Sequence, residues 1–122
     1  MQEQGREFSV VATTLFLNRW WNLPRFFSLV GGVRRQLKET PGLVRYQLKA
    51  NFLKLQFSTL SIWESGNAID DFAHKGPHLT ALQAFPTLAK KGSAFVRWTT
   101  TSPDAVTWKE AFQRLQKPAE RN

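Results

Sequence analysis

Residues 55–82, LQFSTLSIWESGNAIDDFAHKGPHLTAL, constrain the fold most, because a strand pattern runs directly into a helix start within them. Leu60 and Ile62 alternate with more polar residues up to Trp63, which is the period-two pattern of a strand. Ser65 follows almost at once, and its hydroxyl can accept a hydrogen bond from a free N–H of a first helical turn. The stretch therefore predicts a strand that ends at a tryptophan and feeds a capped helix.

The helix that follows Ser65 is predicted to be broken. Ile69 and Phe72 supply its apolar stripe, and Gly76 ends it. Pro77 suits the first turn of a second helix, because its missing N–H and restricted φ cost nothing there. His78 is therefore expected in the first turn of a new helical segment.

Length and composition allow one domain, residues 1–122, with an ordered core at about 8–116. The absence of cysteine excludes disulfides, iron–sulfur clusters, thiolate nucleophiles and cysteine-ligated zinc. No run approaches the roughly 20 apolar residues of a membrane span, and MQEQGREF lacks the basic-then-apolar order of a signal peptide. We therefore expect a soluble, cytoplasmic protein.

The net charge of +8 raises the question of nucleic-acid binding. The basic residues are spread along the chain, and the densest group, Arg34, Arg35 and Lys38, falls on one side of a helix whose other side is apolar. A solvated helix face explains this pattern better than a phosphate-binding surface. Nucleic acid is therefore a disfavoured partner.

The remaining elements follow from changes of period and from turn residues. They are a strand at 8–19, a helix at 25–39, a strand at 43–52 joined by a hairpin to the strand at 55–63, a strand at 93–101, and a last helix with Ser102 as N-cap, Pro103 in its first turn and Lys117-Pro118 at its end. This order predicts an α+β fold, the ferredoxin-like β-α-β-β-α-β antiparallel sheet with an extra C-terminal helix. The expected strand order is 4-1-3-2.

Gly31 and Gly32 lie in the middle of the helix at 25–39, where each costs about 1 kcal/mol relative to alanine. Close approach of this helix to the sheet is the reason that we expect for them.

The strand at 8–19 carries apolar residues on both faces, whereas the helices of a ferredoxin-like sheet cover only one face. A second copy of the chain is the simplest cover for the other face, because most soluble oligomers are symmetric homodimers. We therefore expect a homodimer in which two sheets close into an α+β barrel.

Three short motifs and the order of elements together resemble the dimeric α+β-barrel superfamily. The motifs are ETPG at 39–42, TLSIWES at 59–65 and FAHKGPH at 72–78. More narrowly, the chain is similar to the antibiotic-biosynthesis-monooxygenase and spheroidene-monooxygenase-like members, over roughly residues 8–115. The resemblance implies a cavity between sheet and helices, used in different members for cofactor-free oxygenation of polycyclic aromatics, for haem binding or breakdown, or for other small-molecule chemistry.

The resemblance also indicates candidate site residues. Trp63 matches the family's tryptophan between strand and helix, His78 matches a histidine that recurs after the broken helix, and Arg97 is placed by its strand. The implied roles are His78 and Arg97 in catalysis, and Trp63, Phe72 and Trp98 in binding the substrate. Trp63, His78, Arg97 and Trp98 are expected around one pocket, although Arg97 and Trp98 are adjacent and must point to opposite sheet faces.

Each candidate has an alternative explanation. Trp63 is either a core aromatic between strand and helix or a wall on which a flat ligand stacks. His78 either bonds backbone groups or acts as a haem ligand or proton shuttle. Arg97 either faces the interior or pairs with a carboxylate such as Glu64. A metal site at His74 and His78 is disfavoured, since Gly76-Pro77 breaks the helix between them, and no metal is expected.

Three functions are compatible with these patterns. The first is a monooxygenase-like oxidoreductase that acts on an apolar aromatic or polyene substrate, with no cofactor or with haem bound at His78. The second is a non-catalytic haem or small-molecule binding protein, which a Soret band would reveal. The third is an anion- or nucleic-acid-binding module that uses the positive charge.

Overall fold

The protein is described from a computed structural model that covers residues 6–116. The elements are β1 (Phe8–Phe16), a 3-10 turn η1 (Trp20–Asn22), α1 (Leu23–Lys38), β2 (Leu43–Asn51), β3 (Gln56–Trp63), α2 (Gly66–Ala73), α3 (Gly76–Leu88), β4 (Ala94–Thr100), a second 3-10 turn η2 (Pro103–Ala105) and α4 (Trp108–Leu115). No helix of this part of the chain is long and apolar enough to cross a bilayer.

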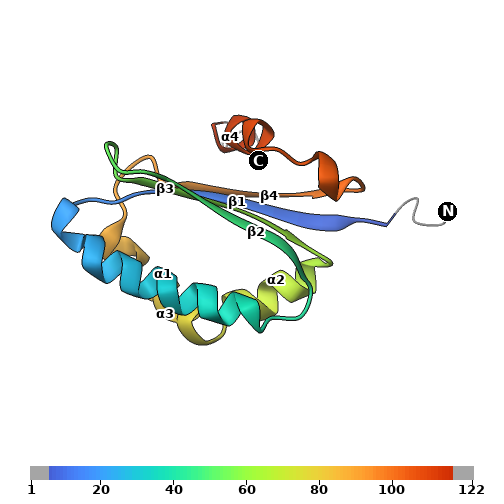
Figure 1. Cartoon of the computed structure of the whole chain (residues 1–122), viewed down its shortest axis with the longest axis horizontal. Helices are drawn as coiled ribbons and strands as arrows, with labels where there is room; N and C mark the ends of the chain where they lie inside the picture. Colours follow the sequence, from blue (N-terminus) through green and yellow to red (C-terminus); the bar gives the residue numbers. More distant parts are fainter. Residues whose placement is uncertain (1–5, 117–122) are drawn as a thin grey trace.

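The four strands form one antiparallel sheet in the order β2-β3-β1-β4 (Figure 1). The predicted α+β, ferredoxin-like order of elements is confirmed, and so is the predicted strand order. The first strand is shorter than expected: it ends at Phe16, and beyond it Leu17 makes only an isolated bridge to Ala89. The chain turns away there because the backbone N–H of Asn18 donates to the Leu88 carbonyl, 2.8 Å away, at the end of α3.

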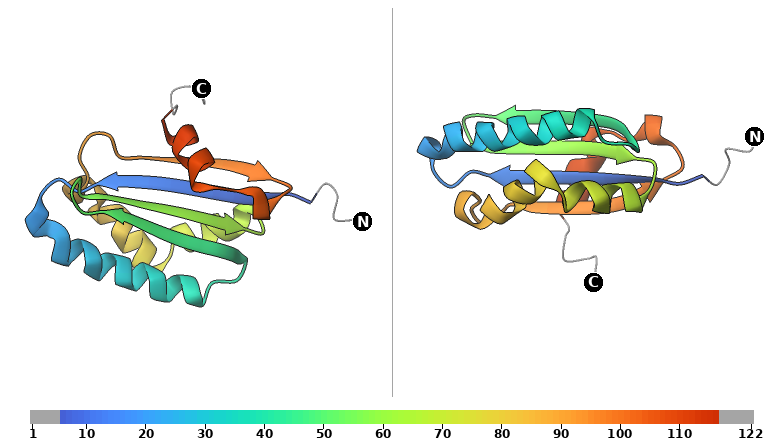
Figure 2. Two further views of the ribbon diagram at one scale, coloured as in Figure 1. Left: turned by 45° about the horizontal axis from the view of Figure 1, so that its top comes forward. Right: turned by 90° about the horizontal axis from the view of Figure 1, so that it is seen from below.

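Helices α1, α2 and α3 cover one face of the sheet (Figures 1 and 2). Two groups of buried side chains fill the space beneath them. At one end of the sheet lie Leu17, Phe26, Phe57, Ala84 and Leu88, and at the other Leu37, Trp63, Ile69 and Phe72.

Helix α4 packs on the opposite face of the same sheet (Figure 1). Its Ala111 and Leu115 are buried against Val10, Ile62 and Val96. The sequence led us to expect a second copy of the chain on this face. Much of this face is instead covered by α4 of the same chain. The connection at 101–107 is long enough to carry the chain around the edge of the sheet.

The start of α4 differs from the prediction. Ser102 and Pro103 lead into the short turn η2, and Ser102 makes no side-chain cap. The helix begins five residues later, where the hydroxyl of Thr107 accepts from the N–H of Glu110 at 3.2 Å. Ser102 and Thr107 are both possible N-caps. Burial of the Val106 side chain between them favours the helix start at Thr107. The predicted end at Lys117-Pro118 lies outside the described residues.

The close approach at Gly32 is to a helix and not to the sheet. A Cβ built on Gly32 would lie 3.2 Å from the Pro77 Cβ, whereas one on Gly31 would meet only the flexible end of Arg35 at 3.6 Å. Helices α1 and α3 therefore approach each other closely at the break between α2 and α3. The prediction of a glycine-mediated contact is confirmed, but the element contacted was wrong.

Candidate functional site

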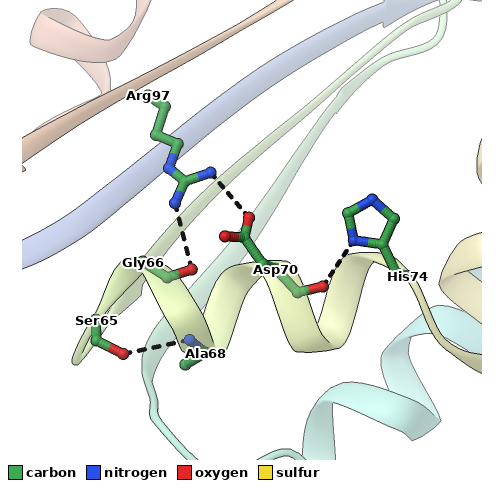
Figure 3. Close-up of polar contacts among 6 residues, drawn as sticks. All are labelled: Ser65, Gly66, Ala68, Asp70, His74 and Arg97. Carbon is green, nitrogen blue, oxygen red and sulfur yellow. Dashed lines mark hydrogen bonds and ion pairs between the residues drawn. The ribbon is translucent and has the colours of Figure 1, made fainter.

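Two faces of helix α2 (Gly66–Ala73) contact different predicted site residues. One face carries Phe72 into the core beside Trp63, and the other carries Asp70 toward Arg97 (Figure 3). The helix begins where the hydroxyl of Ser65 accepts from the N–H of Ala68 at 3.2 Å, so the predicted N-cap is confirmed.

Trp63, Phe72 and His78 form a row of aromatic rings on the core side. The ring centroids of Trp63 and Phe72 are 5.3 Å apart, and those of Phe72 and His78 are 4.7 Å apart. Trp63 is only 2% exposed, and its indole N–H donates to the hydroxyl of Ser61 at 2.9 Å. This end of the row is core packing, whereas His78 is half-buried at the other end.

The contacts of His78 define which ring nitrogen is available. Its Nδ1 lies 3.1 Å from the carbonyl oxygen of Ala73, which can only accept, so Nδ1 carries the proton. Nε2 then keeps its lone pair. Nε2 has no hydrogen-bond partner among residues 6–116. Every fully buried side-chain nitrogen and oxygen of these residues does have a partner, so Nε2 reaches the surface.

Burial lowers the pKa of His78 below its ordinary value of 6.5. The hydrogen bond to the Ala73 carbonyl opposes this shift, and the nearby positive charge of His74 adds to it. The ring is therefore neutral at pH 7, with a free lone pair that can take a proton or bind an electrophile.

Gln36 of α1 holds the break in place, and the sequence analysis missed it. Its amide donates to the carbonyls of Phe72 and Lys75 at 3.1 and 3.0 Å, and its carbonyl accepts from the backbone N–H of His78 at 2.8 Å. The N–H of His78 lies in the first turn of α3, where it has no helical partner. The carbonyls of Phe72 and Lys75 also accept from the backbone N–H groups of Lys75 and Leu79, respectively. No local pattern could reveal this role, since the partners are 36 to 42 residues apart in the chain.

Arg97 lies on the helix-covered face of the sheet and pairs with α2. Its Nη1 is 3.2 Å from the Asp70 carboxylate, and its Nη2 donates to the Gly66 carbonyl at 3.3 Å (Figure 3). Of the two predicted alternatives, the structure has the pairing with a carboxylate, and that carboxylate is Asp70 and not Glu64. Both side chains are solvent-exposed, so the ion pair contributes little to stability.

His74 and His78 bond different carbonyls and do not share a site. The His74 Nδ1 contacts the Asp70 carbonyl at 2.9 Å on the exposed face of α2 (Figure 3). Within residues 6–116, no three His, Asp or Glu side chains gather closely enough to hold a metal ion.

Trp98 does not lie with the other candidates. It pairs with Val10 across the sheet and packs on the face that α4 covers, with the guanidinium of Arg114 4.6 Å from its ring centroid. The opposite directions of Arg97 and Trp98 follow from strand geometry, as expected.

Tyr46 is a further polar group near the core side, and it was not among the candidates named from the sequence. It lies opposite Ser61 in the sheet and packs beside Trp63. Burial raises the pKa of its phenol above 10.0, and the positive charge of Arg34 partly offsets this. The phenol is therefore a neutral hydrogen-bond donor at pH 7.

Two of the surface hollows lie at the β2–β3 hairpin. One, of about 470 Å³, lies between the hairpin and Phe112 of α4, and the other, of about 540 Å³, lies between the hairpin and the α3–β4 connection. None of Trp63, His78 and Arg97 lines either hollow. The pocket expected around these residues stays a prediction.

Solved structures share this arrangement of elements. A protein described as an antibiotic biosynthesis monooxygenase matches with a TM-score of 0.64 at 15% identity, over 82% of this chain and 99% of its own. SnoaB from Streptomyces nogalater, a cofactor-independent oxygenase, matches with a TM-score of 0.59 at 17% identity, over 78% and 93%. A dimeric ferredoxin-like protein of unknown function from Jannaschia sp. CCS1 matches with a TM-score of 0.62 at 15% identity, over 75% and 97%.

This chain has their fold. The resemblance drawn from the sequence is thereby confirmed for the architecture, which at these identities is all that the likeness shows. No protein-family model and no curated protein sequence matches the chain.

Proposed function

We propose that the protein is a small monooxygenase-like enzyme for an apolar aromatic or polyene substrate, with His78 as its proton acceptor. The observation that supports this proposal is the state of the imidazole. It is neutral, its Nδ1 is held by the Ala73 carbonyl while Gln36 holds the backbone N–H of the same residue, and its Nε2 reaches the surface at the end of an aromatic row. Two structures of the same fold are described as oxygenases, one of them cofactor-independent.

The chemistry that suits this group begins with removal of a proton from a hydroxy-aromatic substrate. The resulting anion is rich in electrons and can reduce dioxygen itself. When a methylene between aromatic rings becomes a carbonyl, one oxygen atom stays in the product and the other leaves as water, so no external reductant is needed. His78 Nε2 takes the proton.

Arg97 has a secondary role in this proposal. Two of its five N–H donors bind Asp70 and Gly66, and the others can stabilise a developing oxyanion. Its exposure makes this contribution smaller than that of His78.

The test is oxygen consumption with a panel of tricyclic hydroxy-aromatic ketones, without added cofactor. We expect His78→Gln, which keeps a polar side chain but removes the base, to lower the rate by about 100-fold or more. His74→Gln is the matched control and should retain the rate. Equal rates in the wild type and His78→Gln would rule out the proposed role.

The alternative is a non-catalytic haem or small-molecule binding protein. His78 offers one nitrogen ligand, but the neighbouring Trp63, Ile69 and Phe72 are buried in core packing. His78 lines neither of the two hollows at the hairpin, so neither hollow provides a porphyrin site at this histidine. A Soret band that disappears in His78→Gln would nevertheless favour this alternative over the oxygenase.

We also propose that the chain forms a homodimer, as the neighbour from Jannaschia sp. does by its description. On the α4 side of β2, Gln47 is exposed, whereas Arg45 donates to the Val106 carbonyl and the Lys49 ammonium lies over the Trp108 ring of α4. Sedimentation at micromolar concentration should give twice the chain mass of 14.0 kDa. A single species at the chain mass would contradict the dimer.

A further inference from the structure

Three segments far apart in sequence meet at one end of the molecule, which we call the hairpin end and define as residues 16–27, 49–56 and 85–95. The N–H of Leu17 donates to the Leu55 carbonyl and the N–H of Lys90 to the Phe16 carbonyl, both at 2.8 Å. Figures 1 and 2 show the β2–β3 turn, the start of α1 and the α3–β4 connection together there. These backbone bonds make the hairpin end one continuous surface.

Most of the exposed large apolar side chains of residues 6–116 lie on the hairpin end, with only Val44 and Leu82 elsewhere. Leu53, at the tip of the β2–β3 turn, is 99% exposed, and Trp20 and Trp21 are 68% and 60% exposed. Exposed apolar groups scattered singly need no explanation, but a concentration at one end indicates a binding surface.

The aromatic part of this surface rests on a rigid base. The exposed rings of Phe27 and Phe52 lie 5.7 and 5.6 Å from the ring centroid of Phe57, which is buried. Phe57 in turn packs on Phe26 at 4.5 Å. This packing restricts the exposed rings before binding, so that ordering them on binding costs less side-chain entropy.

The charge of the hairpin end has one sign. No Asp or Glu occurs at 8–38, 40–63 or 72–103, so the hairpin end contains none. Its basic residues are Arg19, Arg25, Lys49, Lys54, Lys90 and Lys91. The acidic side chains of Glu39, Glu64 and Asp70 lie beyond the other ends of α1 and β3, where basic residues such as Lys38 and Arg97 accompany them.

Basic and apolar groups of this end line one hollow. The hollow of about 540 Å³ is lined by the basic residues Lys54, Lys90 and Lys91 and by the apolar residues Phe16, Leu53 and Leu55. An anionic headgroup attached to an apolar chain matches this combination.

We infer that the hairpin end binds the surface of an anionic phospholipid bilayer. Leu53, Phe52 and the two exposed tryptophans enter the boundary between headgroups and acyl chains, where amphipathic aromatic rings are favoured. Lys54, Lys90 and Lys91 contact the lipid phosphates. The inference stands independently of the proposed oxygenase activity.

A bilayer fits this surface better than a nucleic acid does. Single-stranded nucleic acids need a basic groove that follows the backbone, with flat rings for stacking. The hairpin end is instead a protruding tip whose most exposed side chain, Leu53, is aliphatic and cannot stack on a base. Contact between the hairpin ends of two copies of the chain is opposed by the six like charges that would face each other.

The first test is co-sedimentation with phosphatidylcholine vesicles containing about one-third phosphatidylserine, in about 0.15 M salt. We expect the protein to pellet with these vesicles and to stay in solution with pure phosphatidylcholine. Each basic residue at an anionic surface contributes about fivefold to partitioning. Lys54→Gln/Lys90→Gln/Lys91→Gln should therefore lower binding at least tenfold.

The matched control is Arg34→Gln/Arg35→Gln/Lys38→Gln, which removes the same net charge from the exposed side of α1. It should bind within about threefold of the wild type, because these residues lie beyond the Debye length of about 8 Å from a bilayer at the tip. Equal loss in the two triple variants would overturn the inference in favour of diffuse charge attraction.

The apolar contribution is tested with Leu53→Glu, which removes no internal packing because Leu53 is fully exposed. It should weaken vesicle binding at least fivefold, whereas Leu82→Glu on α3 should not. Absence of wild-type binding to the anionic vesicles would overturn the inference. So would a wild-type oligomer that Leu53→Glu dissociates, or a labelled single-stranded oligonucleotide that binds the tip while the vesicles do not.

Discussion

At the scale of single residues, His78 is positioned by groups that contribute nothing to its chemistry. Gln36 holds its backbone, Ala73 fixes its tautomer, and Phe72 covers one face of its ring. Burial disfavours the charged imidazolium, which is why a weakly basic but available nitrogen results. The proposed reactivity therefore depends on the α2–α3 break as much as on the histidine.

The lowered pKa of His78 predicts a pH dependence of stability. The unfolded chain binds a proton at about pH 6.5, whereas the folded chain binds it only at lower pH, so stability falls as the pH drops below about 6.5. The loss stops below the folded pKa. Urea unfolding of wild type and His78→Gln at pH 7.5 and 5 should show a larger loss for the wild type.

His74→Gln is the control for that comparison, because His74 is exposed on α2. It should retain most of the wild-type dependence of stability on pH, because burial is the largest cause of the lowered pKa of His78 and His74 the smallest. If the free energy of unfolding changed equally with pH in the wild type and in His78→Gln, the assigned burial of His78 would be contradicted.

We expect Gln36→Met to lower the stability of the protein, chiefly because the N–H of His78 would lose its partner. Methionine has nearly the same length, but it cannot bond the carbonyls of Phe72 and Lys75 or the N–H of His78. We expect a fall of about 1–3 kcal/mol in the free energy of unfolding. Gln83→Met, at an exposed position of α3, should change it by less than about 0.5 kcal/mol.

At the scale of elements, the contact between α1 and α3 explains one of two adjacent glycines. Gly32 faces Pro77, whose ring is rigid and belongs to the first turn of α3. Gly31 faces open space apart from the Arg35 side chain. The two positions therefore form a matched pair within one helix.

Gly31→Ala should stabilise the protein by about 0.5–1 kcal/mol, because alanine is the better helix former and its methyl group meets only an ordinary contact. Gly32→Ala should lose that gain or destabilise the protein, since its methyl group would press on Pro77 at 3.2 Å. Chemical denaturation of both variants measures the difference. Equal stabilisation by the two would show that α1 and α3 can separate without cost.

At the scale of the whole molecule, the sheet lies between helices on both faces. Helix α4 covers Val10, Ile62 and Val96, which would otherwise expose an apolar surface. Its N-cap at Thr107 and its Arg114–Glu110 ion pair, 3.0 Å long, support a helix of only eight residues. Such a short helix depends on packing for most of its stability.

Ala111→Asp should therefore detach α4. Ala111 is fully buried against the sheet, and a carboxylate there would have no partner, at a cost of at least about 2–3 kcal/mol. We expect increased binding of a fluorescent apolar dye as the sheet face is exposed. Gln113→Asp, on the exposed side of the same helix, should bind the dye no more than the wild type does.

The sequence alone determined the elements and their order, because strand alternation, the Ser65 cap and the Gly76-Pro77 break are local signals. It also placed His78 at a helix start and Arg97 and Trp98 on opposite faces of β4. Tertiary structure decided the rest: the bonds of Gln36, the pairing of Arg97 with Asp70, the contact of Gly32 with Pro77 and the face that α4 covers. Each joins residues well separated along the chain, so each depends on how the elements pack and leaves no periodic signal in the sequence.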